Sequence, residues 1–260
     1  MILAEPSPTQ GDIHFRVGGT PVRIHPFFWV TTLILGISGG GSTPPAEVIG
    51  WICAVFVSIL IHELGHAVAQ RHYGGHSRII LYAMGGLAAC NDCDRSTRSQ
   101  ILISLAGPCA GFAFAALVLV AIRVVGHQVG VQLGPDVRLE LLGLESARIM
   151  RILGLTFYWE PFLSDKVDHM IGDLIQINVL WGAVNLLPIY PLDGGQISRE
   201  LCLLGQPQRG MVLSLQISVF AAVAMALVGL YWGSLFVALF FGYMAYSSYR
   251  TLNAYRASLW

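Results

Sequence analysis

Long apolar stretches without charge constrain this chain more than any other feature. Residues 48–61, 101–122 and 211–229 contain no Asp, Glu, Lys or Arg, and a helix that crosses a bilayer needs roughly 20 mostly apolar residues. Hydrophobic residues make up 55% of the 260 residues and charged residues 12%, whereas soluble domains carry about 25% charged residues. This composition indicates a membrane protein, in which backbone polar groups are satisfied within helices or closed sheets.

Six stretches are predicted to form transmembrane helices. They cover residues 26–38, 48–69, 101–122, 170–187, 211–229 and 234–249. The long connection 126–169 fits an amphipathic helix on the membrane surface and an ordinary loop helix equally well. Its apolar residues recur at near-helical spacing: Leu139, Leu142, Leu144, Ile149, Ile152 and Leu153.

Arginine placement predicts the orientation, because loops rich in Lys and Arg stay on the cytoplasmic side. If all six helices span, one side holds Arg16, Arg23, Arg71, Arg78, Arg95, Arg98, Arg199, Arg209, Arg250 and Arg256. We therefore expect a cytoplasmic N-terminal segment at 1–25, which lacks the features of a signal peptide. A six-helix core at 26–249 and a short cytoplasmic tail at 250–260 follow, and 126–169 is the non-cytoplasmic loop. The expected location is a cell (inner) membrane.

Charge and cysteine content exclude two classes of protein. The formal net charge is zero, so there is no basic excess to bind nucleic acid. The five cysteines are odd in number and three lie in or beside apolar stretches, which argues against a disulfide framework. Cys90 and Cys93 form a lone C-x-x-C. Two free cytoplasmic thiols are favoured there over a second metal site, which normally needs another ligand pair.

The string His62-Glu63-Leu64-Gly65-His66 carries the chemistry. Helix positions four apart face the same way, so the two imidazoles can share one metal ion. Glu63 projects beside the first of them and can take a proton from a metal-bound water. Charged residues on a membrane helix cost about 2.5–3.5 kcal/mol each, so they usually have a partner or a function. The alternative is a helix end where these side chains merely meet water.

A third metal ligand is expected, because catalytic zinc takes three protein ligands and leaves a position for water. The best candidate is Asp193, just past a segment in which Pro188 and Pro191 break a helix. A broken helix at membrane depth is tolerated where it is buried in protein or lines a polar cavity. The alternative is an aspartate that caps a cytoplasmic turn.

With both strings present, the chain resembles the site-2 protease family of intramembrane zinc metalloproteases. His62 to His66 matches the family's first motif, and Asn185 to Gly194 matches its second, Asn-x-x-Pro-x-x-x-x-Asp-Gly. Ala106-Gly107-Pro108 is similar to the Gly-Pro segment of its central helix, and 79–87 resembles its membrane re-entrant β-hairpin. The expected fold is an all-α multi-pass membrane protein with about six transmembrane helices and a small re-entrant β-hairpin. It would be a compact member without a PDZ or CBS domain.

The resemblance implies one zinc ion per chain with ligands His62, His66 and Asp193. It implies Glu63 as the general base of an endopeptidase, and Asn185 as the residue that holds the substrate or stabilises the oxyanion. His25 could approach this site, but a place in the headgroup region is favoured.

The implied substrate is a transmembrane protein in the lipid bilayer, cleaved after its helix partly unwinds. The strand edge at 79–87 could hold the extended segment by main-chain pairing. Gly85 and Gly86 suit a turn or a close approach of the backbone, and they are the candidates for substrate binding. The alternative for 79–87 is a buried apolar loop. A regulatory membrane or soluble partner is also compatible with the resemblance.

Two other functions compete with proteolysis. Intramembrane His and Asp also mark ion pathways, so a metal transporter is the first alternative. Transporters often contain internal repeats, and the sequence shows none. A non-catalytic scaffold that binds membrane helices is the second alternative, and the presence of Glu63 argues against it.

Overall fold

The computed structural model describes residues 5–37, 44–135 and 146–257. Each of the six predicted helices is present in these ranges. They are α1 (Pro26–Ile37), α2 (Pro45–His72), α3 (Thr97–Val124), α4 (Asp165–Asn185), α6 (Gly210–Tyr231) and α7 (Leu235–Ala257). A further helix, α5 (Asp193–Gly205), follows the proline-broken segment. Helix α7 continues beyond the predicted sixth helix, into the predicted tail, as far as Ala257.

Three of these helices are long and apolar enough to cross a membrane, namely α2, α3 and α6, and α1 is apolar but shorter. The mostly helical membrane fold is therefore confirmed, whereas the crossing of α1, α4 and α7 stays a prediction. Inside α4, a polar side chain has an internal partner, since Asn178 Nδ2 donates to Ser58 Oγ of α2 at 2.8 Å. Such pairing satisfies polar groups within an apolar bundle.

A four-stranded sheet packs beside the N-terminal helices, in the order β1-β2-β3-β4. The predicted hairpin is confirmed as the antiparallel pair β3 (Ser77–Tyr82) and β4 (Gly85–Cys90). The other half was not predicted: β1 (Ile13–Val17) and β2 (Thr20–Ile24) form a second hairpin, and β2 runs parallel to β3. The all-α class is thus too narrow for the chain.

A second sheet lies within the described part of 126–169, so the prediction of a helix is wrong for its strands, whereas 165–169 belong to α4. Its strands are β5 (Val129–Leu133), β6 (Arg148–Ile152) and β7 (Leu155–Trp159), in the order β5-β7-β6. Between β6 and β7, Leu153 and Gly154 both have positive φ, as a two-residue hairpin turn requires. This turn, rather than the apolar spacing, decides the local structure. The predicted helix positions Leu139, Leu142 and Leu144 lie outside the described residues.

The second sheet is fastened to the start of α4 by a buried aspartate. Asp168 accepts hydrogen bonds from Trp159 Nε1 at 2.9 Å and from Phe162 N at 3.2 Å. It also pairs with Arg148, which contacts Asp165 as well. Because the buried carboxylate is satisfied from several directions, the sheet has a fixed place on α4.

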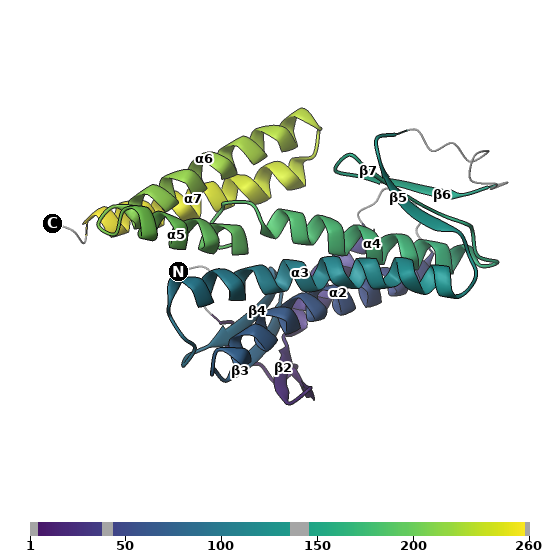
Figure 1. Cartoon of the computed structure of the whole chain (residues 1–260), viewed down its shortest axis with the longest axis horizontal. Coiled ribbons are helices and arrows are strands. Elements are labelled where there is room, and N and C mark those ends of the chain that lie inside the picture. Colours follow the sequence, from purple (N-terminus) through teal and green to yellow (C-terminus); the bar gives the residue numbers. More distant parts are fainter. Residues whose placement is uncertain (1–4, 38–43, 136–145, 258–260) are drawn as a thin grey trace.

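The long helices form a layered bundle between the two sheets (Figure 1). The first sheet precedes α3 and the second follows it, so they lie at opposite ends of this 28-residue helix. The α6–α7 hairpin packs against α5 and the α4–α5 connection, and α2 packs against both α3 and α4. Both described chain ends lie at the end of the bundle where α3 begins (Figure 1).

Candidate metal centre

Two histidines of α2 lie one helical turn apart and face the same point. The Nε2 atoms of His62 and His66 are 3.1 Å apart. Both side chains are buried, as expected for the inner face of a helix in a bundle.

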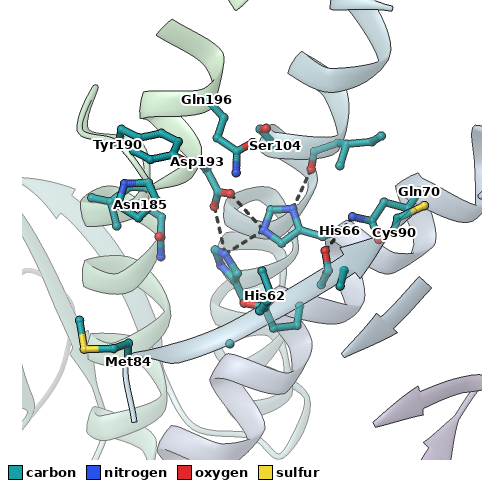
Figure 2. Close-up of a pocket in the computed structure, with 18 of the residues that line it drawn as sticks. His62, His66, Gln70, Met84, Cys90, Ser104, Asn185, Tyr190, Asp193 and Gln196 are labelled. Atoms are coloured by element: carbon teal, nitrogen blue, oxygen red, sulfur yellow. Dashed lines mark hydrogen bonds and ion pairs between the residues drawn. The ribbon is translucent and has the colours of Figure 1, made fainter. Parts of the chain in front are cut away.

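Asp193 completes a triangle with this pair, from 131 residues downstream of His62. Helix α4 ends at Asn185 and α5 begins at Asp193, so the carboxylate stands at the start of a new helix. Its Oδ2 lies 3.1 Å from His62 Nε2 and its Oδ1 lies 3.3 Å from His66 Nε2. Figure 2 shows the three side chains converging. Donor atoms around tetrahedral zinc are about 3.3 Å apart, given bonds of about 2.0–2.1 Å, so this donor set fits one zinc ion.

The orientation of His66 is fixed by α3. Its Nδ1 lies 2.7 Å from the carbonyl oxygen of Ile103. Because a carbonyl can only accept, Nδ1 carries the proton and Nε2 keeps its lone pair for a metal.

Two glycines allow α2 and α3 to approach closely at the histidines. A Cβ atom on Gly107 would overlap the Nε2 atoms of His66 and His62, and one on Gly65 would overlap the carbonyl of Ala106. From the sequence, Ala106-Gly107-Pro108 was of interest only because it resembles the Gly-Pro segment of the site-2 protease family's central helix. The structure shows the physical reason for Gly107, which leaves space where the metal ligands converge.

The loop that delivers Asp193 is held by two serines of the last two helices. Ser218 Oγ accepts a hydrogen bond from Tyr190 N at 2.7 Å, and Ser248 Oγ donates to Tyr190 O at 3.2 Å. The two hydroxyls are 2.8 Å apart, and both side chains are fully buried. Sequence reasoning missed these residues, although hydroxyls in otherwise apolar helices are a signal for interhelical hydrogen bonds.

Glu63 is buried beside the pair, at 4% exposure. Its carboxylate and the ring nitrogens of His62 and His66 lie within 4.8 Å of one another. A Cβ on Gly86 would overlap the Glu63 carboxylate, so this glycine lets β4 reach the site. The backbone amide of Ala88 in the same strand also faces that carboxylate.

These residues open into a cavity of about 440 Å³ between α2, β4 and the α4–α5 connection. Asn185 lies on its wall (Figure 2). Its Nδ2 donates to Trp181 O at 2.9 Å. The side-chain amide of Asn185 has a second N–H, which the bond to Trp181 O does not use. Gly85 has a φ of +120° and packs against the Trp181 ring. The structure thus brings every predicted site residue to this cavity or to its rim.

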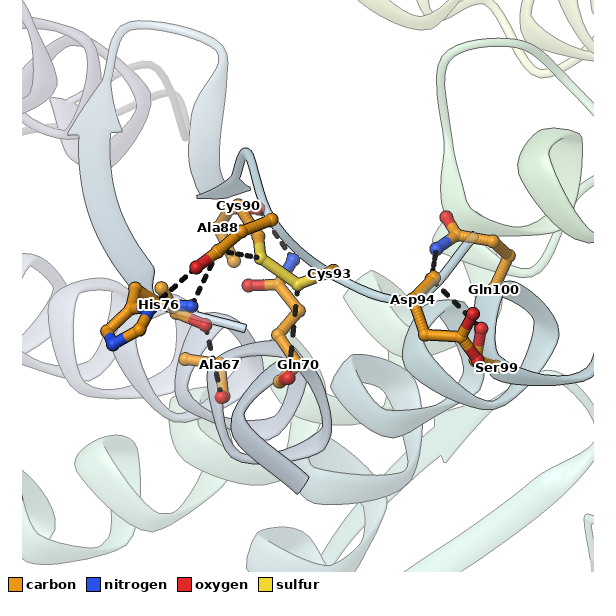
Figure 3. The surroundings of a disulfide bond; sticks show 11 residues. Ala67, Gln70, His76, Ala88, Cys90, Cys93, Asp94, Ser99 and Gln100 are labelled. Carbon is orange, nitrogen blue, oxygen red and sulfur yellow. Dashed lines mark hydrogen bonds and ion pairs between the residues drawn. A yellow bond between two sulfur atoms is a disulfide. The ribbon is translucent and has the colours of Figure 1, made fainter. Parts of the chain in front are cut away.

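The prediction of free thiols at the C-x-x-C is wrong, because a disulfide joins Cys90 and Cys93 (Figure 3). The chain turns sharply after β4, which brings the two Cα atoms within 5.9 Å. A Cβ on Gly75 would overlap both sulfur atoms. Bonded sulfurs are not thiolate ligands, so the second metal site has no support in this state.

His76 contacts the acidic residue inside this turn. Its backbone N–H and its ring both bond the Asp92 carboxylate, at 2.8 and 2.5 Å, and hold the pKa of Asp92 below its usual range. His25, the remaining candidate, is buried at the junction of β2 and α1, where its Nδ1 accepts from Phe27 N at 3.3 Å.

The apolar helices and the buried His–His–Asp cluster with its adjacent glutamate define a membrane protein with a metallopeptidase type of metal site. The model of peptidase family M50 matches residues 50–227, and the chain belongs to this family. The resemblance stated from the sequence is thereby confirmed.

Individual relatives agree with this assignment. The zinc metalloprotease MJ0392 of Methanocaldococcus jannaschii is 23% identical over 223 residues, which cover 85% of this chain and 53% of that protein. Stage IV sporulation protein FB of Bacillus subtilis is 26% identical over 180 residues, which cover 68% of this chain and 46% of that protein. The chain spans about half the length of the curated relatives it matches.

A solved structure shares the fold. The site-2 protease from Methanocaldococcus jannaschii superposes with a TM-score of 0.57 at 21% identity, and the match covers 93% of this chain and 95% of that one.

Proposed function

We propose that the chain is a zinc metalloendopeptidase that hydrolyses a peptide bond in or near a transmembrane segment of a membrane protein. The observation that carries this proposal is the convergence of two His Nε2 atoms and both Asp193 oxygens within 3.1–3.3 Å, beside a buried glutamate. His62, His66 and Asp193 are the proposed ligands. A zinc ion bound there would supply a Lewis acid that polarises the scissile carbonyl and makes water more acidic.

The chain's own residues would do the rest of the chemistry. Glu63 accepts the proton of the attacking water and passes it to the leaving amine. Its burial against Gly86 places it where β4 borders the cavity, so proton transfer and substrate contact occur at one wall. The second N–H of Asn185 is proposed to donate to the developing oxyanion.

The substrate would lie extended along the outer edge of β4. A helix hides its peptide groups in internal hydrogen bonds, so it must unwind before attack. Strand addition to an edge gives main-chain hydrogen bonds in exchange. Gly85 and Gly86 fit this role, since they permit close approach at the start of the strand. The orientation with the termini and the cavity mouth towards the cytoplasm is supported by the arginine distribution.

The substitution Glu63→Gln tests the function. It removes the proton acceptor while keeping the shape of the side chain, so we expect cleavage of a membrane-embedded substrate to fall by about 10²–10⁴-fold. Zinc content, measured by mass spectrometry, should stay at the wild-type level. Glu160→Gln, in the loop beyond β7, is the matched control and should cleave normally.

Undiminished cleavage by the Glu63 variant would rule out a peptidase site here. Metal flux into proteoliposomes, without any proteolysis, would instead support the transporter alternative.

A further inference from the structure

Two buried polar atoms in the described part of the chain have no hydrogen-bond partner, Trp181 Nε1 and Gln70 Oε1. Unpaired buried polar atoms are rare and costly, and each one calls for an explanation. Both residues line the catalytic cavity. One atom is a donor and the other is an acceptor.

Trp181 lies one turn before Asn185 on α4, so both face the cavity from the same side of the helix. A Cβ on Gly85 would meet the Trp181 ring at Cζ2, 2.9 Å away, and at Cη2, 3.1 Å away. Cζ2 and Cη2 belong to the six-membered ring, so this part of the indole faces the start of β4, and Nε1 is two bonds away from Cζ2.

Gln70 lies one turn beyond His66 on α2 and is 8% exposed. Its Nε2 donates to Ala88 O at 2.9 Å (Figure 3). Because Ala88 O can only accept, the amide orientation is fixed and Oε1 is the free end. The carbonyl of Ala88 thus points to the outer edge of β4, away from β3, and the carboxamide extends that edge by one amide group.

Trp181 and Gln70 contact β4 at Gly85 and Ala88, three residues apart. Three residues of strand span about 10 Å. An extended peptide offers one N–H and one C=O per residue, which are the two groups that the unpaired atoms lack.

We propose that Trp181 and Gln70 form a main-chain clamp for the extended substrate. Trp181 Nε1 donates to a substrate carbonyl near Gly85, and Gln70 Oε1 accepts from a substrate N–H near Ala88. This inference rests on the proposed proteolysis. It adds how the substrate is recognised, because the clamp binds the backbone of the substrate rather than its side chains.

An apolar groove next to the cavity supplies the route. It has a volume of about 540 Å³ and is lined by α1, α2, α4, α7 and the β3–β4 turn. Trp181 lines the groove and the cavity alike. The indole therefore lies where a segment would pass from apolar surroundings into the cavity.

The first test compares Trp181→Phe with Trp159→Phe, which changes a buried indole of the second sheet, away from the groove and the cavity. Trp159 Nε1 has a partner, the Asp168 carboxylate at 2.9 Å. We expect Trp181→Phe to leave the apparent Tm of the zinc-loaded enzyme unchanged or higher, because an unpaired donor is removed. Its kcat/KM should fall about tenfold. Trp159→Phe should show the reverse: a lower Tm and an unchanged kcat/KM for the folded enzyme.

The second test places a single ester in the substrate, which replaces one amide N–H by oxygen. Wild type should lose about tenfold in kcat/KM at one ester position, away from the scissile bond, and Gln70→Met should not lose activity at that position. Gln100→Met, at the same cavity, should keep the wild-type pattern, because its Nε2 bonds the Asp94 carbonyl instead.

The clamp is overturned if Trp181→Phe keeps the wild-type kcat/KM, or if its activity falls only in step with its Tm. It is equally overturned if Gln70→Met keeps every ester penalty. If wild type does not cleave at all, the proposed function fails first. The clamp is then judged by affinity: in the Glu63→Gln background, Trp181→Phe should weaken binding of an intact transmembrane peptide about tenfold.

Discussion

At the scale of single residues, the candidate metal centre depends on how closely backbones approach. His62 and His66 come from one helix, and their spacing fixes their common direction. A metal ion can fit between them and Asp193 because Gly107 has no side chain to fill that space. The helix α3 contributes no ligand, yet its glycine and the Ile103 carbonyl shape the site.

Gly107→Ala should lower zinc affinity by about 10–100-fold, because the added methyl group overlaps the ligand atoms of both histidines. Competition with a chromophoric chelator measures this affinity. Gly111→Ala is the control one turn further along α3, where a Cβ would lie 3.4 Å from Asn178 Oδ1 and fits with little adjustment. Equal zinc affinity in the two variants would contradict the role given to Gly107.

The residues of the site were predictable to different degrees. His62, Glu63 and His66 follow from motif spacing and from the chemistry of their side chains, whereas Asp193 also needed the resemblance of its segment to the family's second motif. Trp181 and Gln70 do not, because their importance lies in hydrogen bonds that are absent, and only the packed structure shows that. Cys90 and Cys93 were misjudged, since sequence spacing does not reveal how a turn brings two sulfurs together.

At the scale of elements, the α4–α5 connection is the part on which the third ligand depends. It contains Pro188 and Pro191, and at Tyr190 it is anchored by hydroxyls of α6 and α7. A ligand on such a loop needs this support, because a small shift of the carboxylate would change its distances to both histidines.

Ser218→Ala should destabilise the protein by about 1–3 kcal/mol, because it leaves the half-buried Tyr190 N–H without its acceptor. It should also weaken zinc binding, since Asp193 follows this loop. Unfolding in mixed micelles, with and without zinc, measures both effects. Ser214→Ala, one turn earlier in α6, removes only a hydrogen bond to Met211 O and should have the smaller effect. Equal effects would show that the loop is held by other contacts.

The helices could be predicted from hydropathy, whereas most strands could not. In a membrane, a run of about 20 apolar residues can form few structures other than a helix. The strands β1 and β2 are short and partly polar, and β2 finds its parallel partner β3 from more than 50 residues away. In β6 the helical spacing of Ile149 and Ile152 was outweighed by the turn at Leu153 and Gly154.

At the scale of the whole molecule, the positions of the two sheets and of the two chain ends distinguish one end of the helix bundle from the other. The catalytic cavity is lined by Gln100, Ile103 and Ser104, near the start of α3. The second sheet lies at the opposite end of this helix (Figure 1). The arginines of the sequence concentrate towards the first of these ends, which predicts that it faces the cytoplasm.

Cysteine labelling in intact cells tests this direction. In a background with Cys53, Cys109 and Cys202 changed to serine, Leu163→Cys should react with a membrane-impermeant maleimide, because this exposed position lies beside the second sheet. Gln208→Cys, in the exposed turn between α5 and α6, should react only after permeabilisation. The opposite pattern would reverse the proposed orientation.

The central claim is that one zinc ion is held between α2 and the start of α5. Zinc counted per purified chain, for wild type and Asp193→Ala, tests it most directly. The account predicts about one zinc ion in wild type and a clear loss in Asp193→Ala, because two histidines alone form an incomplete site. Asn185→Ala, which removes no proposed ligand, should keep its zinc. Wild-type zinc content in Asp193→Ala would contradict the account.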